Sequence, residues 1–567
     1  MLAAGCSESG PPEPQRDVTP PPEIQSEPPQ PFSVVEASFA DMQAAMAAGQ
    51  VSSRQLVGQY LERIDHYGAK LGAALAVSDR ALERADLLDR ERADGKVRGP
   101  LHGIPVALKD NIHTADLPTT GGALAFAGYV PPYPATLVSK LEDAGAIILA
   151  KTTLTELANW VATGMPNGYN ALGGFSFNPY DPRPDPREGF ADGRPVLDTG
   201  GSSSGVGTAA NLWAANVGTE TSGSMEIPAN NNSLVAIKPT VGRISRHGII
   251  PITADQDTAG PMAKYVADAA ALLGAMEGVD EHDAATGACP LPEDGDYSSH
   301  LQADALAGAR IGVPRAYYYS AVTPPGAEAP VGGLSAEEAR VMEQVIALLR
   351  EQGAVIVDPA DIPSVVAENP ADNQLLFQNC YDLPQGKGGD EHCSTILKYG
   401  MKRDFNAWLD SLGETAPVAS LTALREFNLA HKAEGAIRYG QAELDISDEM
   451  DVEGDFERWR ADRDKDIRLS RTEGIDAALE AHDLDALLLP SWKAENILNK
   501  AGYPAVVVPF SAVSNVLDPP APEGFAPLPM PFGVSFVGTA CAEPRLIELA
   551  FAFEQATHGR KAPLQFP

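Results

Sequence analysis

The sequence predicts an α/β fold built around a large, mostly buried sheet, and three observations support this. Short apolar runs bounded by glycine, proline or polar residues indicate buried strands within residues 104–108, 144–152, 484–492, 503–510 and 532–538. Segments with helical spacing of apolar residues, such as 135–145 and 545–557, alternate with these runs. The length of 567 residues, with 44% hydrophobic and 21% charged side chains, is typical of a globular protein with a sizeable core.

The first 31 residues are expected to lie outside the folded body. Residues 1–6, MLAAGC, are similar to a bacterial lipobox with Cys6 as the lipidated residue, although only five residues precede it. Nine prolines between Pro11 and Pro31 predict an extended, disordered tether. We therefore expect a truncated lipobox-like start and a tether over 1–31. The corresponding location is the bacterial cell envelope or periplasm, through a lipid anchor, with the cytoplasm as the alternative.

Residues 32–567 are predicted to form one domain. A helix is expected over 52–68, where Ser52 and Gln55 can form a capping box, and another over 81–94. Residues 280–480 are richer in helix-forming sequence, with amphipathic segments at 335–353 and 455–483. No proline-rich linker interrupts this region, so we interpret it as a helical elaboration of the same domain.

Charge and cysteine content exclude several classes of function. The net charge of −35 argues against nucleic acid or an anionic membrane surface as a partner. Five scattered cysteines predict no disulfide framework, although Cys380 and Cys393 are near enough in sequence to pair. Cys393 beside His392 raises a metal or cysteine-nucleophile interpretation, which the lack of a second ligand pair at zinc spacing disfavours.

The serine- and glycine-rich segment 200–224 allows three interpretations: a linker, a phosphate-binding loop or part of a catalytic site. A phosphate loop is disfavoured because no Gly-Lys-Ser/Thr follows the glycines. A catalytic serine needs a base, and Lys109 follows an apolar strand at the edge where α/β sheets bind ligands. Burial would lower the pKa of Lys109 toward neutrality and make it a base. The alternative is a structural ion pair between Lys109 and Asp110.

Four motifs, taken together, resemble the amidase signature family of Ser–Ser–Lys hydrolases. In chain order they are GPLHGIPVALKDNI at 99–112, GGSSSG at 200–205, GTETSGSMEIPAN at 218–230 and VAIKPTVGRISRHGIIPITADQDTAGPM at 235–262. The resemblance covers roughly residues 36–563, and the motif sequences are most similar to those of the peptide-amidase-like branch. It implies a large, mixed, twisted sheet covered by helices on both faces.

The resemblance also implies roles for particular residues. Ser224 falls at the nucleophile, Ser202 at the bridging serine and Lys109 at the base, while Ser203 and Ser204 remain possible occupants of the bridging role. The oxyanion hole would be formed by the backbone N–H groups of Thr221, Ser222, Gly223 and Ser224. The family's chemistry requires no metal and no organic cofactor.

Three departures from the family pattern accompany these assignments. Ser202 and Ser224 are 22 positions apart, about two fewer than usual. Glu226 stands where many members carry arginine, and Glu220 replaces the common aspartate. Residues 173–199 form a longer, proline-rich segment before the serines, which is expected to shape the mouth of the substrate site.

The expected function is hydrolysis of a linear carboxylic amide through an acyl-enzyme on Ser224. A small-molecule or peptide amide would be the substrate, and no nucleic acid partner is expected. The alternatives are a catalytic subunit of a tRNA-dependent amidotransferase, a carbamate or ester hydrolase on the same scaffold, and a non-catalytic binding protein. The histidines, such as His102, His247 and His392, are expected to be turn or surface residues and not catalysts.

Overall fold

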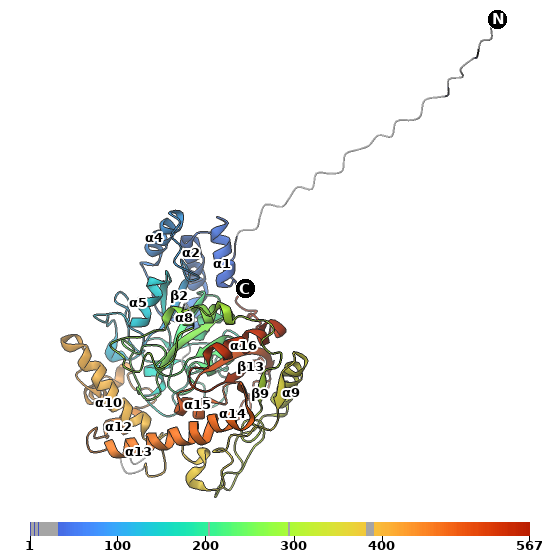
Figure 1. Cartoon of the computed structure of the whole chain (residues 1–567). Coiled ribbons are helices and arrows are strands. Elements are labelled where there is room, and N and C mark those ends of the chain that lie inside the picture. Colours follow the sequence, from blue (N-terminus) through green and yellow to red (C-terminus); the bar gives the residue numbers. More distant parts are fainter. Residues whose placement is uncertain (2–4, 6–9, 11–31, 202–203, 293–294, 382–389) are drawn as a thin grey trace. The chain divides into compact units, whose positions relative to one another are not determined.

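The computed structural model describes residues 1, 5, 10, 32–201, 204–292, 295–381 and 390–567. The chain divides into two units, Met1–Phe32 and Ser33–Pro567. Nearly all of the first unit, Cys6 included, lies outside the described residues, so the tether remains a prediction. Everything below concerns the second unit, whose elements are labelled in Figure 1.

An eleven-stranded sheet forms the centre of the second unit, with the order β1-β3-β2-β6-β8-β7-β12-β13-β11-β9-β10. The predicted α/β class with a large mixed sheet is confirmed, and all five predicted runs contain strands. The bounds are β1 Ala74–Val77, β2 Pro105–Lys109, β3 Ile147–Thr152, β6 Ala215–Glu220, β7 Val235–Lys238, β8 Thr258–Ala263, β9 Arg310–Gly312, β10 Val355–Val357, β11 Ala486–Pro490, β12 Ala505–Val513 and β13 Met530–Val537. A separate two-stranded ribbon joins β4 (Tyr169–Asn170) to β5 (Gly174–Phe175).

Strand direction changes across the sheet. β2 runs parallel to both β3 and β6, and β9 runs parallel to β10 and β11. The strands between these groups pair antiparallel, including β6 with β8 and β12 with β13. Every residue of β2, β3, β6, β7, β8 and β11 is buried, as expected of strands that are covered on both faces.

Helices flank this sheet (Figure 1). Their bounds are α1 Phe39–Ala47, α2 Ser53–Arg63, α3 Ala69–Leu71, α4 Ala81–Ala93, α5 Thr136–Asp143, α6 Gly205–Ala209, α7 Glu226–Asn231, α8 Val266–Met276, α9 Ala336–Glu351, α10 Ile396–Ser411, α11 Leu421–Ala430, α12 Ala442–Asp448, α13 Phe456–Ile467, α14 Asp476–His482, α15 Glu495–Ala501 and α16 Glu543–Thr557. The predicted capping box is present, because Ser52 accepts from the N–H of Gln55 and Gln55 accepts from the N–H of Ser52. Between α13 and α14 the backbone forms a π-helix, Arg468–Ile475, which departs from helical geometry at Gly474.

Residues 280–480 contribute more than helices. They supply α9 to α13 and also β9 and β10, which extend the main sheet at one edge. A second apolar cluster lies where α10 packs against the loops that follow β2 and β3. It includes Phe126, Trp160, Phe405 and Trp408. This cluster supports the loops around Trp160 that border the site described below.

Two disulfides link described segments. Cys380 pairs with Cys393, as the sequence allowed, and Cys289 pairs with Cys541 across 252 positions. The expectation that the cysteines form no disulfide framework is therefore wrong, because separation along the chain does not measure separation in the fold. Cys393 is bonded to Cys380, so its sulfur is not a free thiolate for a nucleophilic or metal-binding role.

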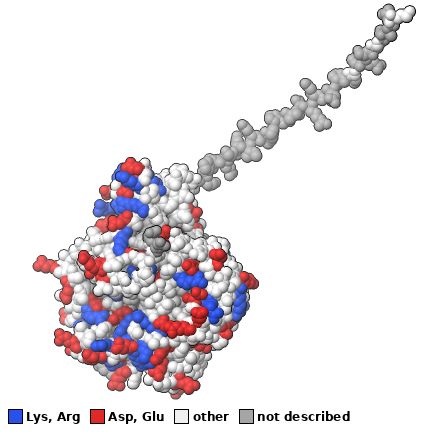
Figure 2. All heavy atoms as spheres, viewed as in Figure 1, with Lys and Arg blue, Asp and Glu red and all other residues white. Residues whose placement is uncertain are grey.

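Acidic and basic side chains are intermixed over the visible face of the protein (Figure 2). The whole chain carries 77 acidic and 42 basic residues, and on this face the acidic side chains do not form a single patch. This arrangement is typical of a solvated surface.

Candidate active site

Lys109 is the last residue of β2 and is completely buried. Its Nζ donates hydrogen bonds to the carbonyl oxygen and to Oγ1 of Thr219 on β6, at 3.1 and 2.9 Å. Burial lowers the pKa of Lys109 to about 7. The alternative ion pair with Asp110 does not form, because Asp110 pairs with Lys151 of β3 at 3.2 Å. Lys109 is thus a buried amine whose environment favours the neutral form.

Ser224 lies in the turn that follows β6 and precedes α7. It is 6% exposed. The turn bends at Gly223, which has a φ of +78°, a conformation that side chains disfavour. A Cβ at Gly223 would also lie 2.2 Å from Oε2 of Glu495. Glycine is therefore required here both for the backbone angle and for the close approach of Glu495.

The serine-rich loop passes directly beside Ser224. A Cβ at Gly201 would lie 3.3 Å from Ser224 Oγ, so Gly201 leaves room for the hydroxyl. Ser202 and Ser203 lie outside the described residues. Ser204 is fully buried and faces β6, since a Cβ at Gly218 would lie 3.4 Å from Ser204 Oγ.

The short spacing between Ser202 and Ser224 corresponds to a short helix and a tight turn in the structure. The segment holds a helix of only five residues, α6, which opens just after the serine run, and then β6. The chain reverses between them at Asn211, whose φ of 56° lies in the left-handed region that asparagine tolerates. A short helix and a tight turn accommodate the shortened segment.

The 252–257 loop holds Thr221 from two sides. Thr221 Oγ1 donates to Oδ1 of Asp257 at 2.5 Å, and Gln256 Nε2 donates to the Thr221 carbonyl at 2.9 Å. Asp257 in turn accepts the N–H groups of Ile252 and Thr253. Burial raises the pKa of Asp257 to about 7. Sequence reasoning assigned no role to Gln256 or Asp257; their position just before β8, the antiparallel neighbour of β6, is the signal that could have found them.

The two glutamates that depart from the family pattern lie beneath the same turn. Glu220 Oε2 accepts the N–H groups of Met225 and Glu226, at 2.6 and 3.1 Å, and so holds the start of α7 against β6. Glu226 is fully buried, and burial followed by the charge of Glu220 raises its pKa well above the usual range. Burial thus favours the neutral form of this carboxyl group, which stands where many members of the family carry arginine.

The outer side of the Ser224 turn is bordered by polar groups and aromatic rings. Asp198, at the end of the long segment 173–199, accepts the Gly200 N–H at 2.6 Å and the Asn167 amide at 2.9 Å. Tyr381 hydrogen-bonds Ser222, and its ring lies 5.6 Å from that of Trp160. Segments that lie far apart in the sequence therefore meet at this border.

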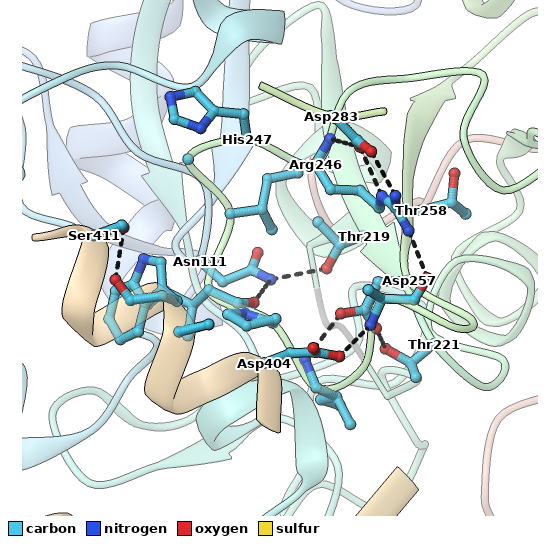
Figure 3. A pocket seen from close by; sticks show the side chains of 18 of the residues that line it. Asn111, Thr219, Thr221, Arg246, His247, Asp257, Thr258, Asp283, Asp404 and Ser411 are labelled. Carbon is cyan, nitrogen blue, oxygen red and sulfur yellow. Dashed lines mark hydrogen bonds and ion pairs between the residues drawn. The ribbon is translucent and has the colours of Figure 1, made fainter. Parts of the chain in front are cut away.

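A cavity of about 280 Å³ lies on the inner side of the turn (Figure 3). Asn111, Thr219, Thr221 and Asp257 line it, and Asn111 Nδ2 donates to Thr219 Oγ1 at 3.0 Å. Thr219 thus connects Lys109 to this cavity.

The three histidines lie in turns, as expected. His102 is fully buried and its ring bonds the Leu88 carbonyl. His247 lines the inner cavity (Figure 3). Its ring stacks on that of His282, with the ring centroids 4.4 Å apart. His392 is exposed, as expected.

A buried lysine and a serine that follows a glycine turn thus lie at neighbouring strand ends of this sheet, the arrangement expected from the resemblance to the amidase signature family. The chain belongs to the amidase family, because the family model described as Amidase matches residues 55–382. A protein of Arabidopsis thaliana named as a probable amidase is 33% identical over 94% of this chain and 92% of its own length. An amidase-named protein of Schizosaccharomyces pombe is 30% identical over 94% and 87%.

Solved structures lead to the same family. The native peptide amidase of Stenotrophomonas maltophilia is 37% identical, with a TM-score of 0.77, over 94% of this chain and 99% of its own. The peptide amidase has also been solved with the competitive inhibitor chymostatin. Glutamyl-tRNA(Gln) amidotransferase A subunits, for example that of Chloroflexus aurantiacus, match only 56% of this chain. The family and these neighbours support amide hydrolysis and do not favour the amidotransferase alternative.

The expected source and location are wrong. Two curated relatives named above, which each align over 94% of the chain, come from a plant and a yeast, and this contradicts the expected bacterial lipid-anchored envelope protein. Among the described residues, no helix is both long and apolar enough to cross a membrane.

Proposed function

We propose that this protein hydrolyses linear carboxylic amides through an acyl-enzyme on Ser224, with Ser202 as the proton relay and Lys109 as the base. The observation that carries the proposal is the state of Lys109. A fully buried amine with a pKa of about 7 can accept a proton at neutral pH, whereas an ordinary lysine cannot.

The position of Ser224 supports its role as the nucleophile. β6 carries Thr219, the hydrogen-bond partner of Lys109, and the chain reaches Ser224 five residues later. Gly201, the residue before Ser202, lies against the Ser224 hydroxyl. The proposed relay is therefore adjacent in sequence to a residue that contacts the proposed nucleophile.

The turn around Ser224 supports an oxyanion hole of backbone N–H groups from Thr221, Ser222, Gly223 and Ser224. Such donors accelerate acyl transfer when they are held rigidly before charge develops. Gln256 and Asp257 fix Thr221, and Glu220 fixes the far end of the turn. The backbone is thus preorganised from both ends.

The proposed reaction runs in two halves. Neutral Lys109 takes a proton from Ser202 as Ser202 takes one from Ser224, whose oxygen attacks the amide carbonyl. The tetrahedral oxyanion accepts hydrogen bonds from the turn. As the C–N bond breaks, Ser202 donates a proton to the leaving nitrogen and regains one from Lys109. A water molecule, deprotonated by the same route, then hydrolyses the ester on Ser224 and releases the carboxylic acid.

The substrate class we propose is a small-molecule or peptide amide. The peptide amidase structures, each 37% identical over 94% of the chain, support a peptide or peptide-like substrate. The border formed by Asp198, Asn167 and Tyr381 offers polar and aromatic groups of the kind that orient such a chain.

The test compares Ser224→Ala with the wild type on a chromogenic anilide and a fluorophosphonate label. We expect both hydrolysis and labelling to vanish in Ser224→Ala, with the thermal unfolding midpoint retained. Ser139→Ala, at an exposed serine of α5, is the matched control and should behave as the wild type. Undiminished turnover by Ser224→Ala would overturn the proposal.

The relay is tested separately. Ser202→Ala is expected to lower kcat by about a hundredfold or more, the usual effect of losing a proton-transfer group. Ser203→Ala should change kcat much less. The reverse order would move the relay to Ser203.

A further inference from the structure

A second cavity, of about 210 Å³, lies beside the Ser224 turn, on the side where α15 begins. Its lining comes from three segments that the catalytic motifs do not include: 317–332, 374–378 and 492–497. The residues relevant here are Tyr317, Tyr318, Gln374, Trp492, Lys493 and Glu495. The proposed mechanism uses none of them.

Glu495 connects this cavity to the catalytic turn. Its Oε2 occupies the space that a side chain on Gly223 would fill, one residue before Ser224. The same side chain lines the cavity and influences Tyr317 electrostatically. A substrate group that reached Glu495 would therefore lie next to the proposed nucleophile.

The lining is rich in hydrogen-bond acceptors and aromatic rings. Gln374 is 2% exposed, and its Oε1 has no hydrogen-bond partner among the described residues, while its Nε2 donates to Asn496. Tyr317 and Tyr318 pack edge to face at 5.2 Å, and Trp492 adds a third ring. A carboxyl group, a free amide oxygen and aromatic faces together favour an organic cation.

The charges around Glu495 agree with this chemistry. Burial, and then the charge of Glu220, raises the pKa of Glu495 to about 8, so the cavity holds a carboxyl group that an entering cation would help to ionise. The cationic group in the lining, Lys493, donates to the Gly333 carbonyl at 3.2 Å.

We propose that this cavity is a subsite for a primary ammonium group of the substrate and that Glu495 determines this specificity. The inference rests on the proposed function of Ser224. In a primary amide the ammonium must belong to the acyl part of the substrate, because the leaving group is ammonia and cannot reach a second subsite. The preferred substrates are thus amides of amino-substituted carboxylic acids, which include amino-acid and basic peptide amides.

The test measures kcat/KM, from ammonia release, for two matched series of primary amides. One series carries an ammonium after one to five methylenes in the acyl chain; the other ends in a methyl group at the same length. The wild type should prefer at least one ammonium amide over its isostere by about tenfold or more, the effect of one hydrogen bond to a charged group. The best chain length would measure the reach from Ser224 to Glu495.

Variants at Glu495 separate specificity from folding. Glu495→Gln should lower the preference ratio by about tenfold, whereas Glu495→Asp, which keeps the charge, should retain a preference. Glu351→Gln, the same change at an exposed position at the end of α9, is the matched control and should leave the ratio unchanged.

The outcomes distinguish this inference from the proposed function. If the methyl amides are hydrolysed in a Ser224-dependent manner but no ammonium amide is preferred, the subsite is refuted and the proposed function stands. A ratio that survives in Glu495→Gln likewise refutes the role of Glu495. If neither series is hydrolysed, the proposed function fails and the subsite fails with it.

Discussion

Two fully buried lysines lie on neighbouring parallel strands and meet opposite environments. Lys151, on β3, forms an ion pair with Asp110 and donates to Thr119 and to the Pro118 carbonyl. Lys109, on β2, donates to uncharged oxygens of Thr219. Both are 0% exposed, so burial does not distinguish them. The hydrogen-bond partner distinguishes them. The Asp110 carboxylate stabilises the protonated form of Lys151, whereas Lys109 donates hydrogen bonds to no carboxylate and is therefore an amine suited to proton transfer.

The largest expected effect follows from removing each amine. Lys109→Met should lower kcat by about a hundredfold to ten-thousandfold, because it removes the general base. Its free energy of unfolding should fall by no more than about 1.5 kcal/mol, since only hydrogen bonds to Thr219 are lost, while the cost of depressing the pKa of a buried lysine is removed. Amide turnover and chemical denaturation measure the two quantities. Loss of stability without loss of turnover would reverse the roles of the two lysines.

Lys151→Met is the matched change on the neighbouring strand. It leaves Asp110 buried without its cation, and the expected loss of unfolding free energy is about 3–5 kcal/mol. Denaturant titration at pH 7 measures this loss. A Lys151→Met protein as stable as the wild type would show that the ion pair does not stabilise the fold.

The pH dependence of stability gives a smaller effect with a defined sign. The pKa of Lys109 is lowered from 10.5 to about 7 in the folded protein. Between these values the unfolded chain binds the additional proton, so this group makes stability rise with pH across the window. Denaturation of the wild type and Lys109→Met from pH 7 to 10 isolates its contribution. The slope should be smaller in Lys109→Met, and equal slopes would contradict a depressed pKa.

The smallest effect concerns Asp257, whose charge acts on Lys109 at a distance. Asp257→Asn keeps an oxygen for the Thr221 hydroxyl but removes the charge that favours protonated Lys109. The acid limb of kcat/KM should shift to lower pH. A purely structural role for Asp257 would lower kcat/KM without moving the limb.

The residues proposed for catalysis were readable from the sequence because they follow the ends of neighbouring strands. Lys109 closes β2, Ser224 follows β6, and each lies within a continuous motif. The five apolar strand runs and the capping box at Ser52 were also predicted, whereas β6, β7 and β8 were not assigned as strands. Local sequence carries this information because the carboxyl ends of neighbouring parallel strands, such as β2 and β6, lie at the same edge of the sheet.

The walls of the site were not predictable in this way. Asp198, Tyr381 and Glu495 reach the Ser224 turn from three distant segments, and no pattern in any one segment indicates the other two. The Cys289–Cys541 disulfide escaped prediction for the same reason. The contacts arise from tertiary packing, which periodicity and motif spacing do not encode.

The central claim, that Lys109 acts as a neutral base, is tested most directly by the pH dependence of Ser224 acylation. We would measure the rate of labelling by an uncharged fluorophosphonate from pH 5 to 9 in the wild type and in Asp257→Asn. The account predicts that the wild-type rate rises with pH and levels off above a pKa of about 7. In Asp257→Asn the rate should rise in the same way, but with its midpoint at a lower pH. A rate independent of pH, or a limb that disappears in Asp257→Asn, would contradict it.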